Sequence, residues 1–218
     1  MKRSFDLILS LLGLIILAPL LAALALLIKL DSPGPVFYRG VRAGRFGKPF
    51  RIFKFRTMVE DADKVGGWST AGDDPRVTRT GRFLRKYKLD ELPQLFNVLL
   101  GEMSLVGPRP QVPWAVDLYT EEERCILRVR PGITDPASLE FRDEGEILRA
   151  STNPDKDYLE KIHPEKMRLS LEYVRTQSFW LDCKILWQTV AAVLFRPSTS
   201  KSELKVERSP VSDLAHKS

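Results

Sequence analysis

Residues 80–110 read TGRFLRKYKLDELPQLFNVLLGEMSLVGPRP, and the rest of the chain is interpreted around this stretch. Its acidic pair, Asp90 and Glu91, follows several lysines and arginines and precedes a Gly-Pro-Arg-Pro turn that carries Arg109. Apolar residues recur over 92–100 at helical spacing, and the proline at position 93 suits the first turn of a helix. The sequence therefore predicts that the acidic pair lies at, or just before, a helix N-terminus.

Two interpretations of the acidic pair remain open at this point. Carboxylates at the start of a helix commonly cap its free N–H groups and offset the helix dipole. Alternatively, an ionised Asp beside a divalent metal can attack phosphorus, while a second acid holds the metal and arginines clamp the phosphoryl oxygens. The stretch contains the residue types that both interpretations need.

The composition favours an anionic partner. The chain has 218 residues and a formal net charge of +6, which suits nucleic acid, anionic lipid or phosphorylated substrates. Its length allows one compact domain with an attachment.

Residues 7–28 form an apolar run interrupted only by Ser10 as a polar residue. As one helix the run would be about 33 Å long, enough to cross a bilayer core of about 30 Å. Pro19 lies near its middle and is expected to kink or break the helix. Cations flank both ends, beginning with Lys2 and Lys29, and such flanks stay on the cytoplasmic side. A re-entrant helix–break–helix would keep both cationic flanks on the cytoplasmic side. An ordinary kinked spanning helix is the alternative.

Residues 36–39 and 50–56 are predicted as the two strands of a basic β-hairpin. Alternation places Lys54 and Arg56 on one face of the second strand. Two cations so spaced can grip one phosphate or two linked phosphates. The alternative is a solvated strand face near anionic headgroups.

The remaining chain is predicted to be mostly helical. Residues 140–150 and 156–176 are predicted to be helical, and the second segment is expected to break near His163. Residues 179–196 are predicted to form a helix that lies either in the membrane interface or against the domain core. The polar residues 197–218 are predicted to be a disordered tail. The predicted fold is a helix-rich, membrane-associated α+β domain with a small β-hairpin and amphipathic interfacial helices. Its parts are a membrane helix (1–31), a catalytic domain (32–196) and the tail.

Short motifs follow one another in a fixed order from residue 2 to about 135 and, more weakly, to about 196. Together they form a recognisable family pattern. They are Lys2-Arg3, Asp6, Gly34-Pro35-Val36-Phe37-Tyr38-Arg39, Lys48-Pro49-Phe50, Lys54-Phe55-Arg56-Thr57-Met58, Asp74-Pro75-Arg76-Val77-Thr78, Gly81-Arg82-Phe83-Leu84-Arg85-Lys86, Leu89-Asp90-Glu91-Leu92-Pro93-Gln94, Gly101-Glu102-Met103-Ser104-Leu105-Val106-Gly107-Pro108-Arg109-Pro110 and Pro131-Gly132-Ile133-Thr134. With the Pro-broken apolar segment, these motifs resemble the bacterial sugar transferase family, the monotopic phosphoglycosyl transferases.

The resemblance implies an enzyme that moves a sugar-1-phosphate from a UDP-sugar to a polyprenyl (undecaprenyl) phosphate. UMP leaves, and a phosphosugar is held covalently on an aspartate between the two steps. Such a reaction initiates assembly of a capsule, exopolysaccharide, O-antigen or glycoprotein glycan. The resemblance also implies Mg²⁺, a re-entrant helix in the bacterial inner membrane, an active site on the cytoplasmic face and possible homodimers. No nucleic-acid partner is expected.

The resemblance implies roles for single residues. Asp90 is expected to be the nucleophile, and Glu91 its partner in Mg²⁺ binding or nucleophile support. Four cations are expected to bind substrate phosphates: Lys54, Arg56, Arg85 and Arg109. Many relatives continue Pro-Gly-Ile-Thr with Gly-Trp-Ala-Gln, whereas this chain has Asp-Pro-Ala-Ser, so Asp135 and Arg142 are assigned only as candidates for contact with the nucleotide or sugar.

Two other functions compete with this one. The Asp-x-Asp triplet, Asp61 and Asp63, could hold a metal–nucleotide complex in a glycosyltransferase that releases UDP instead of UMP. A triplet recurs often by chance, however, and a solvated helix turn is the preferred explanation. A basic, membrane-tethered binding module would show affinity that weakens steeply with salt and would be indifferent to loss of Asp90. No position in the sequence identifies the sugar.

Overall fold

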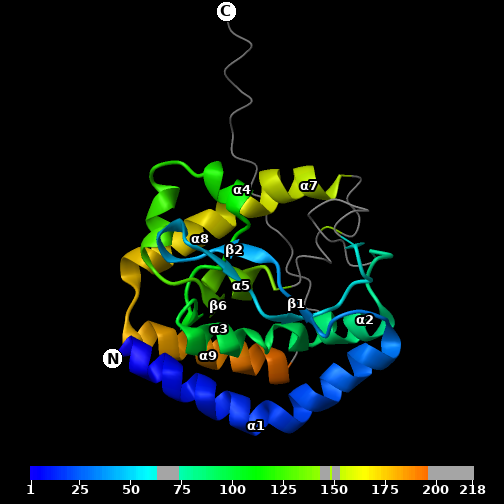
Figure 1. Ribbon diagram of the computed structural model, residues 1–218. Helices are drawn as coiled ribbons and strands as arrows, with labels where there is room; N and C mark the ends of the chain where they lie inside the picture. The colour runs from blue at the N-terminus through cyan, green and yellow to red at the C-terminus, as the bar shows by residue number, and fades with distance from the viewer. Residues whose placement is uncertain (63–73, 143–147, 149–152, 196–218) are drawn as a thin grey trace, which may run out of the picture.

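The computed structural model describes residues 1–62, 74–142, 148 and 153–195. Within them one long helix lies below a mixed domain of helices and short strand pairs (Figure 1). The helices are α1 (Lys2–Asp31), α2 (Arg79–Lys86), α3 (Gln94–Leu100), α4 (Pro113–Asp117), α5 (Pro136–Glu140), α7 (Pro154–Asp157), α8 (His163–Thr176) and α9 (Phe179–Leu194). The predicted helix-rich α+β class is confirmed.

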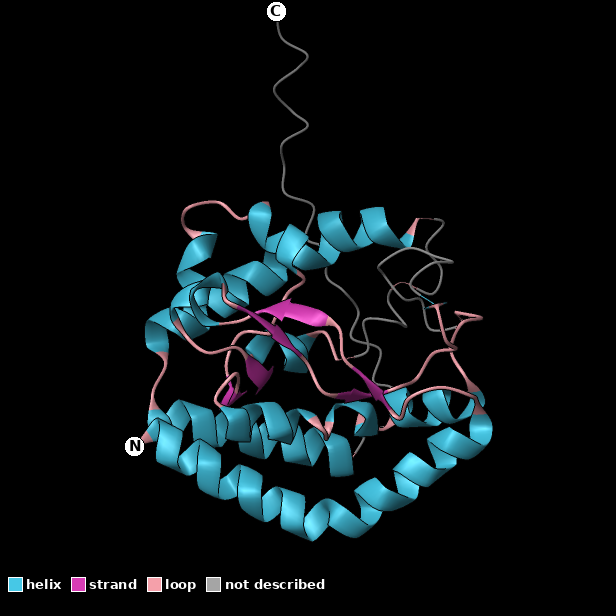
Figure 2. Ribbon diagram, viewed as in Figure 1, coloured by secondary structure: helices cyan, strands magenta, loops and turns pink. Residues whose placement is uncertain are grey.

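Helix α1 is continuous over 30 residues with Pro19 inside it. It bends near its middle, so the proline kinks the helix without ending it (Figure 2). Its buried residues are Asp6 and Ser10 in the first half and Leu24 and Ile28 in the last turns. Both ends of α1 therefore pack on the domain, while its middle turns present mostly exposed apolar side chains.

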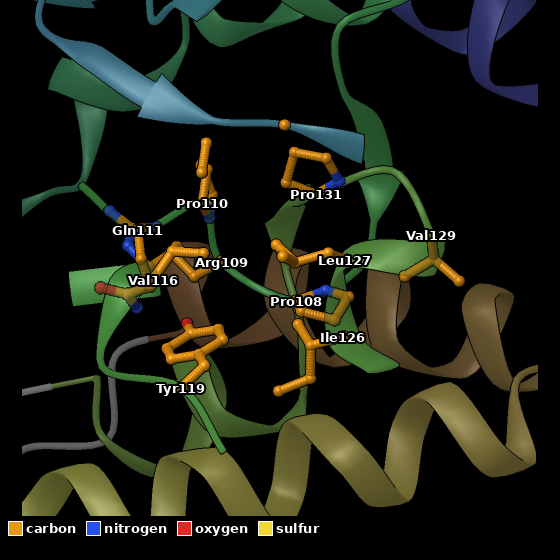
Figure 3. A pocket seen from close by; sticks show the side chains of 12 residues that line it. Pro108, Arg109, Pro110, Gln111, Val116, Tyr119, Ile126, Leu127, Val129 and Pro131 are labelled. Carbon is orange, nitrogen blue, oxygen red and sulfur yellow. The ribbon is translucent and has the colours of Figure 1, made fainter. Parts of the chain in front are cut away.

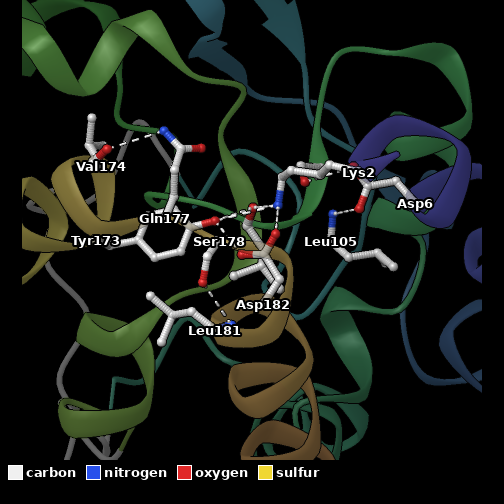
Figure 4. Close-up of polar contacts among 11 residues, drawn as sticks. Lys2, Asp6, Leu105, Tyr173, Val174, Gln177, Ser178, Leu181 and Asp182 are labelled. Atoms are coloured by element: carbon white, nitrogen blue, oxygen red, sulfur yellow. Dashed lines mark hydrogen bonds and ion pairs between the residues drawn. The ribbon is translucent and has the colours of Figure 1, made fainter.

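Polar contacts fix the first turns of α1 (Figure 4). The Lys2 ammonium donates to Asp182 Oδ2 at 2.5 Å and to the Val106 carbonyl at 3.0 Å. Tyr173 donates to the same carboxylate at 2.6 Å. Asp6, one turn further along, accepts a bond of 2.8 Å from the Ser104 hydroxyl. This end of α1 is thereby tied to α9, α8 and the strand that leads to the Gly-Pro-Arg-Pro turn.

Apolar packing fixes the other end of α1. Leu24 and Ile28 form one buried cluster with Phe55 and Leu84. The Asp31 carboxylate accepts a hydrogen bond of 3.0 Å from the backbone N–H of residue 80. The two ends of this apolar helix thus contact opposite parts of one domain.

The predicted hairpin forms as two short antiparallel pairs. Strand β1 (Phe37–Tyr38) pairs with β4 (Lys54–Phe55), and β2 (Val41–Ala43) pairs with β3 (Pro49–Arg51). The prediction of one continuous second strand over 50–56 was wrong. Its ladder is interrupted because Asn97 on α3 accepts from the backbone N–H of residue 53 at 2.8 Å and donates to the carbonyl of residue 51 at 2.9 Å. This amide clamps the hairpin to α3.

A parallel pair, β5 (Ser104–Val106) with β6 (Gly132–Thr134), was not predicted. The chains approach so closely beyond β5 that a Cβ on Gly132 would lie 2.1 Å from the nitrogen of Gly107. Alanine at position 132 therefore cannot be accommodated without moving the backbone. The pair anchors the turn that carries Arg109.

The C-terminal helices agree with the predictions in outline. A π-helical turn, Tyr158–Ile162, joins α7 to α8 at the predicted break before His163. Helix α9 lies next to α1 (Figure 1) and exposes Trp180 and Trp187, at 79% and 72% of their surface. Most of the predicted helix over 140–150, and the predicted tail over 197–218, lie outside the described residues.

Candidate functional site

Asp90 and Glu91 lie in a 3₁₀ turn, Leu89–Glu91, directly before α3. The prediction that they precede a helix start is confirmed. Neither the turn nor α3 has a side-chain cap hydrogen bond in the described structure, so the capping part of the first interpretation is not observed. Both acids lie in the first turn, where they can still offset the helix dipole. Asp90 is 7% exposed, and its Oδ1 atom is buried with no hydrogen-bond partner among the described residues.

Glu91 is held by two of the predicted phosphate-binding cations. The Arg109 guanidinium donates to both carboxylate oxygens, to Oε2 at 3.0 Å and also to Oε1. The Lys54 ammonium donates to Oε1 at 2.9 Å and lies 3.7 Å from Oδ2 of Asp90. Lys54 comes from β4 and Arg109 from the turn after β5, so the hairpin and the parallel pair converge on the acidic pair.

The electrostatics separate the two acids. Burial raises the pKa of Asp90; the positive charge of Lys54 opposes this effect, and the negative charge of Glu91 adds to it. Burial also acts against ionisation of Glu91, but Arg109 and Lys54 outweigh it and hold the pKa of Glu91 well below its usual range. Glu91 in turn raises the pKa of Arg109. Glu91 is therefore the ionised carboxylate that binds Lys54 and Arg109, whereas the raised pKa of Asp90 makes its ionised form less favourable.

Two more cations act on Asp90. Arg85, on α2, donates from Nε to the Thr57 hydroxyl at 2.9 Å, and burial lowers its pKa. Lys88 has a left-handed backbone with φ of 55°, and its pKa is also lowered by burial. Lys88 was not among the residues predicted for the site, although a cation two residues before the acidic pair was a signal for it.

Arg56 is not brought to the acidic pair. Its guanidinium donates to the carbonyls of Pro33 and Ser32, at 2.5 and 2.7 Å, and so braces the turn after α1. The predicted joint grip of Lys54 and Arg56 on one phosphate does not form in this structure, because β4 ends at Phe55 and the next side chain turns toward α1. A role for Arg56 in phosphate binding stays a prediction.

The two candidates after residue 134 make structural contacts. Asp135 is fully buried, caps α5 by accepting from the Ser138 N–H at 2.7 Å, and has its pKa raised by burial. Arg142 donates to the carbonyl of Ala192 on α9. Neither has a described hydrogen bond to the acidic pair, and their roles toward nucleotide or sugar stay predictions.

Asp61 is exposed and has a left-handed backbone with φ of 62°. Asp63, its predicted partner in metal binding, lies outside the described residues. No cluster of three or more His, Cys, Asp or Glu side chains that could hold a metal occurs in the described parts of the chain. Asp90 and Glu91 are two carboxylates, fewer than such a cluster needs, so they could hold a metal only together with further ligands such as substrate oxygens or water.

A hollow opens beside Arg109 (Figure 3). A second hollow is also lined by Arg109, and its lining includes Asp135 and Lys166. Tyr119 and Ile126 line both hollows. Arg109 thus contacts the acidic pair and also lines the adjoining hollows.

Comparison with known proteins places the chain in a family. The family model for bacterial sugar transferase matches residues 1–196. An undecaprenyl-phosphate glucose phosphotransferase of Komagataeibacter xylinus is 45% identical over 201 residues, which cover 89% of this chain and 36% of that protein. A UDP-glucose:undecaprenyl-phosphate glucose-1-phosphate transferase of Escherichia coli strain K12 is 44% identical over 195 residues, covering 87% of this chain and 39% of the relative.

A shorter relative is matched over most of its length. The "Uncharacterized sugar transferase EpsL" of Bacillus subtilis strain 168 is 39% identical over 194 residues, covering 89% of this chain and 87% of that protein. By contrast, the chain spans less than two-fifths of the first two relatives. With a family match over nearly its whole length, the chain belongs to the bacterial sugar transferase family.

Proposed function

We propose that this chain is a phosphoglycosyl transferase that moves a sugar-1-phosphate from a UDP-sugar to undecaprenyl phosphate and releases UMP. The observation that carries the proposal is the acidic pair, in which Lys54 and Arg109 hold Glu91 while a buried Asp90 keeps an unpaired oxygen. The names of the relatives supply the substrate class, since the Escherichia coli relative is named for UDP-glucose and undecaprenyl phosphate.

In the first step Asp90 Oδ2 attacks the phosphorus that bears the sugar. The bond between this phosphorus and the oxygen that bridges to UMP breaks, and UMP leaves with the electron pair. In the second step a phosphate oxygen of undecaprenyl phosphate attacks the same phosphorus, and the bond to Asp90 breaks to restore the carboxylate. Because UMP departs before the lipid phosphate attacks, the two anionic substrates need not occupy the site together. Each displacement still brings two anions together, so nearby cations must offset their charge.

The cations of the site suit both steps. Arg109 has five N–H donors, and its pairing with Glu91 fixes the guanidinium while leaving donors for a phosphoryl oxygen. The Lys54 ammonium lies close to both acids and can offset the negative charge where Asp90 approaches the phosphorus. Arg85 supplies further positive charge to Asp90 from α2.

The donor set also fits Mg²⁺, which takes one or two carboxylates and completes its shell with water and substrate phosphates. Asp90 and Glu91 would hold the ion; Oε2 of Glu91 accepts one described bond and so retains a lone pair. When bound, the ion would offset negative charge on the phosphates.

The packing of α1 supports a re-entrant helix, which we place on the cytoplasmic face of the bacterial inner membrane as part of the proposal. Both ends contact one domain through Lys2 and Ile28, whereas a spanning helix would place its ends on opposite sides of the bilayer. The exposed apolar middle, with its bend at Pro19, would enter one leaflet.

Cysteine labelling tests this topology in sealed inverted vesicles, after Cys125 and Cys183 are replaced by serine. Ser4→Cys and Ser32→Cys are both expected to react with a membrane-impermeant maleimide from the outer, formerly cytoplasmic, side. Protection of one of the two until the vesicles are permeabilised would indicate a spanning helix instead.

The nucleotide product tests the proposed reaction. With undecaprenyl phosphate and Mg²⁺, one member of a panel of UDP-sugars is expected to give UMP in an amount equal to the lipid-linked sugar formed. The relatives are named for different sugars, glucose and N-acetylgalactosamine among them, so the panel should include both. Stoichiometric UDP in place of UMP would overturn the proposal and favour a glycosyltransferase.

A further inference from the structure

Gln94, the first residue of α3, carries a buried amide that the proposed reaction does not yet use. Its side chain is 0% exposed, and both its Nε2 and Oε1 atoms lack a hydrogen-bond partner among the described residues. Buried polar groups are nearly always paired, and an unpaired one in a native protein commonly marks a function or a bridging water.

A second buried amide on the same helix has hydrogen-bond partners for both of its polar atoms. Asn97 is also 0% exposed and lies one turn further along α3. Its side chain bonds the backbone at residues 51 and 53 and also donates to Glu102 at 2.7 Å. The unpaired state of Gln94 is therefore not a general property of buried amides on α3.

Gln94 lies one helical turn after Asp90. Leu92 and Pro93 have right-handed helical backbones, so the turn that holds the acids runs directly into α3. The backbone bonds of this segment run from i to i+3, as from Leu92 to Leu89 and from Phe96 to Pro93, so residues four apart lie no more than about a third of a turn from each other around the axis. Asp90 and Gln94 both face the interior, and each has an unpaired buried atom there.

The two oxygens of Asp90 have unlike surroundings. Oδ2 lies 3.7 Å from the Lys54 ammonium, whereas Oδ1 is inaccessible and unpaired. Of the two residues, only Gln94 can donate, because an ionised carboxylate is an acceptor alone. An N–H donated to Oδ1 would hold the carboxylate plane and leave Oδ2 on the side of the cations.

We propose that Gln94 is a positioning residue for the nucleophile: with substrate bound, its amide N–H donates to Oδ1 of Asp90, directly or through one buried water. The inference rests on the proposed function of Asp90. It assigns Gln94 no contact with the sugar or the nucleotide. Loss of the amide should therefore slow the chemical step more than it weakens binding of the UDP-sugar.

The test compares Gln94→Met with Asn97→Leu and the parent, all as full chains in detergent with undecaprenyl phosphate and Mg²⁺. Methionine keeps the length of glutamine but removes both polar atoms. In Gln94→Met, kcat for UMP release is expected to fall about 10- to 100-fold. KM for the UDP-sugar should stay within about twofold, and Tm should be unchanged or higher, because two unpaired buried atoms are gone. Asn97→Leu, which breaks satisfied bonds, should lower Tm.

Two results would overturn the inference. One is a Gln94→Met variant with the kcat of the parent. The other is a Gln94→Met variant whose kcat and Tm fall together as in Asn97→Leu, which would make the amide structural. Failure of the proposed function is distinguishable, because the parent itself would then release no UMP.

Discussion

Replacing Asp90 by asparagine is expected to abolish UMP release from a UDP-sugar in the presence of undecaprenyl phosphate and Mg²⁺. A neutral amide oxygen of nearly the same size is a far weaker nucleophile than a carboxylate. The loss should be on the order of 10⁴-fold or more in kcat, as is typical when an enzyme loses its nucleophile. The measurement is steady-state UMP release by the purified variant.

The folded state of this variant should be intact. Asp90 is buried, its pKa is raised by that burial, and Oδ1 has no described partner, so removing the charge relieves an unfavourable interaction. We therefore expect a Tm equal to or above that of the parent. Asp117→Asn, at an exposed aspartate of α4, is the matched control and should retain full activity. Turnover by Asp90→Asn near that of the parent would contradict the assignment.

Replacing Arg109 by lysine is expected to cost about 10²- to 10³-fold in kcat/KM. Arg109 donates to both oxygens of Glu91, and a lysine cannot reproduce this planar, two-point contact. The variant therefore loses the cation that holds Glu91 beside Asp90 and the fixed donors proposed for the phosphoryl group. Charge alone is kept, so a small effect would mean that the site uses Arg109 only as a distant positive charge.

The effect of Arg109→Lys should extend to stability, because Glu91 is largely buried and would keep only Lys54 as a close partner. A loss of about 1–3 kcal/mol in the free energy of unfolding is expected, less than for a fully buried pair because Arg109 is 34% exposed. Arg124→Lys, on an exposed turn, is the matched control and should change neither kinetics nor unfolding.

The sequence predicts those parts of the site that depend on residues close together in the chain. Helical spacing after position 92 and the proline at position 93 were enough to place Asp90 and Glu91 before a helix. A run of apolar residues with one proline was enough to predict a helix disturbed at Pro19, but the helix–break–helix was wrong, because α1 is continuous and only kinked (Figure 2). The turn chemistry between residues 39 and 50 was enough to predict a hairpin, though not its interruption by Asn97.

The contacts that the sequence did not reveal are long-range. Alternation along a strand placed Arg56 beside Lys54, but the strand ends at Phe55 and the guanidinium braces the turn after α1. Asp135 was a candidate for substrate contact, and it caps α5 in the interior. Nothing in the local pattern marked the parallel pair of β5 with β6, which joins segments far apart in the chain and places Arg109 against Glu91.

The most direct test of the central claim is the mass of the chain after reaction with a UDP-sugar and Mg²⁺ without the lipid acceptor. We predict an increase equal to one sugar-phosphate, located by peptide fragmentation to Asp90, and its loss when undecaprenyl phosphate is added. An unmodified chain in a preparation that nevertheless releases UMP with the acceptor present would contradict the covalent route.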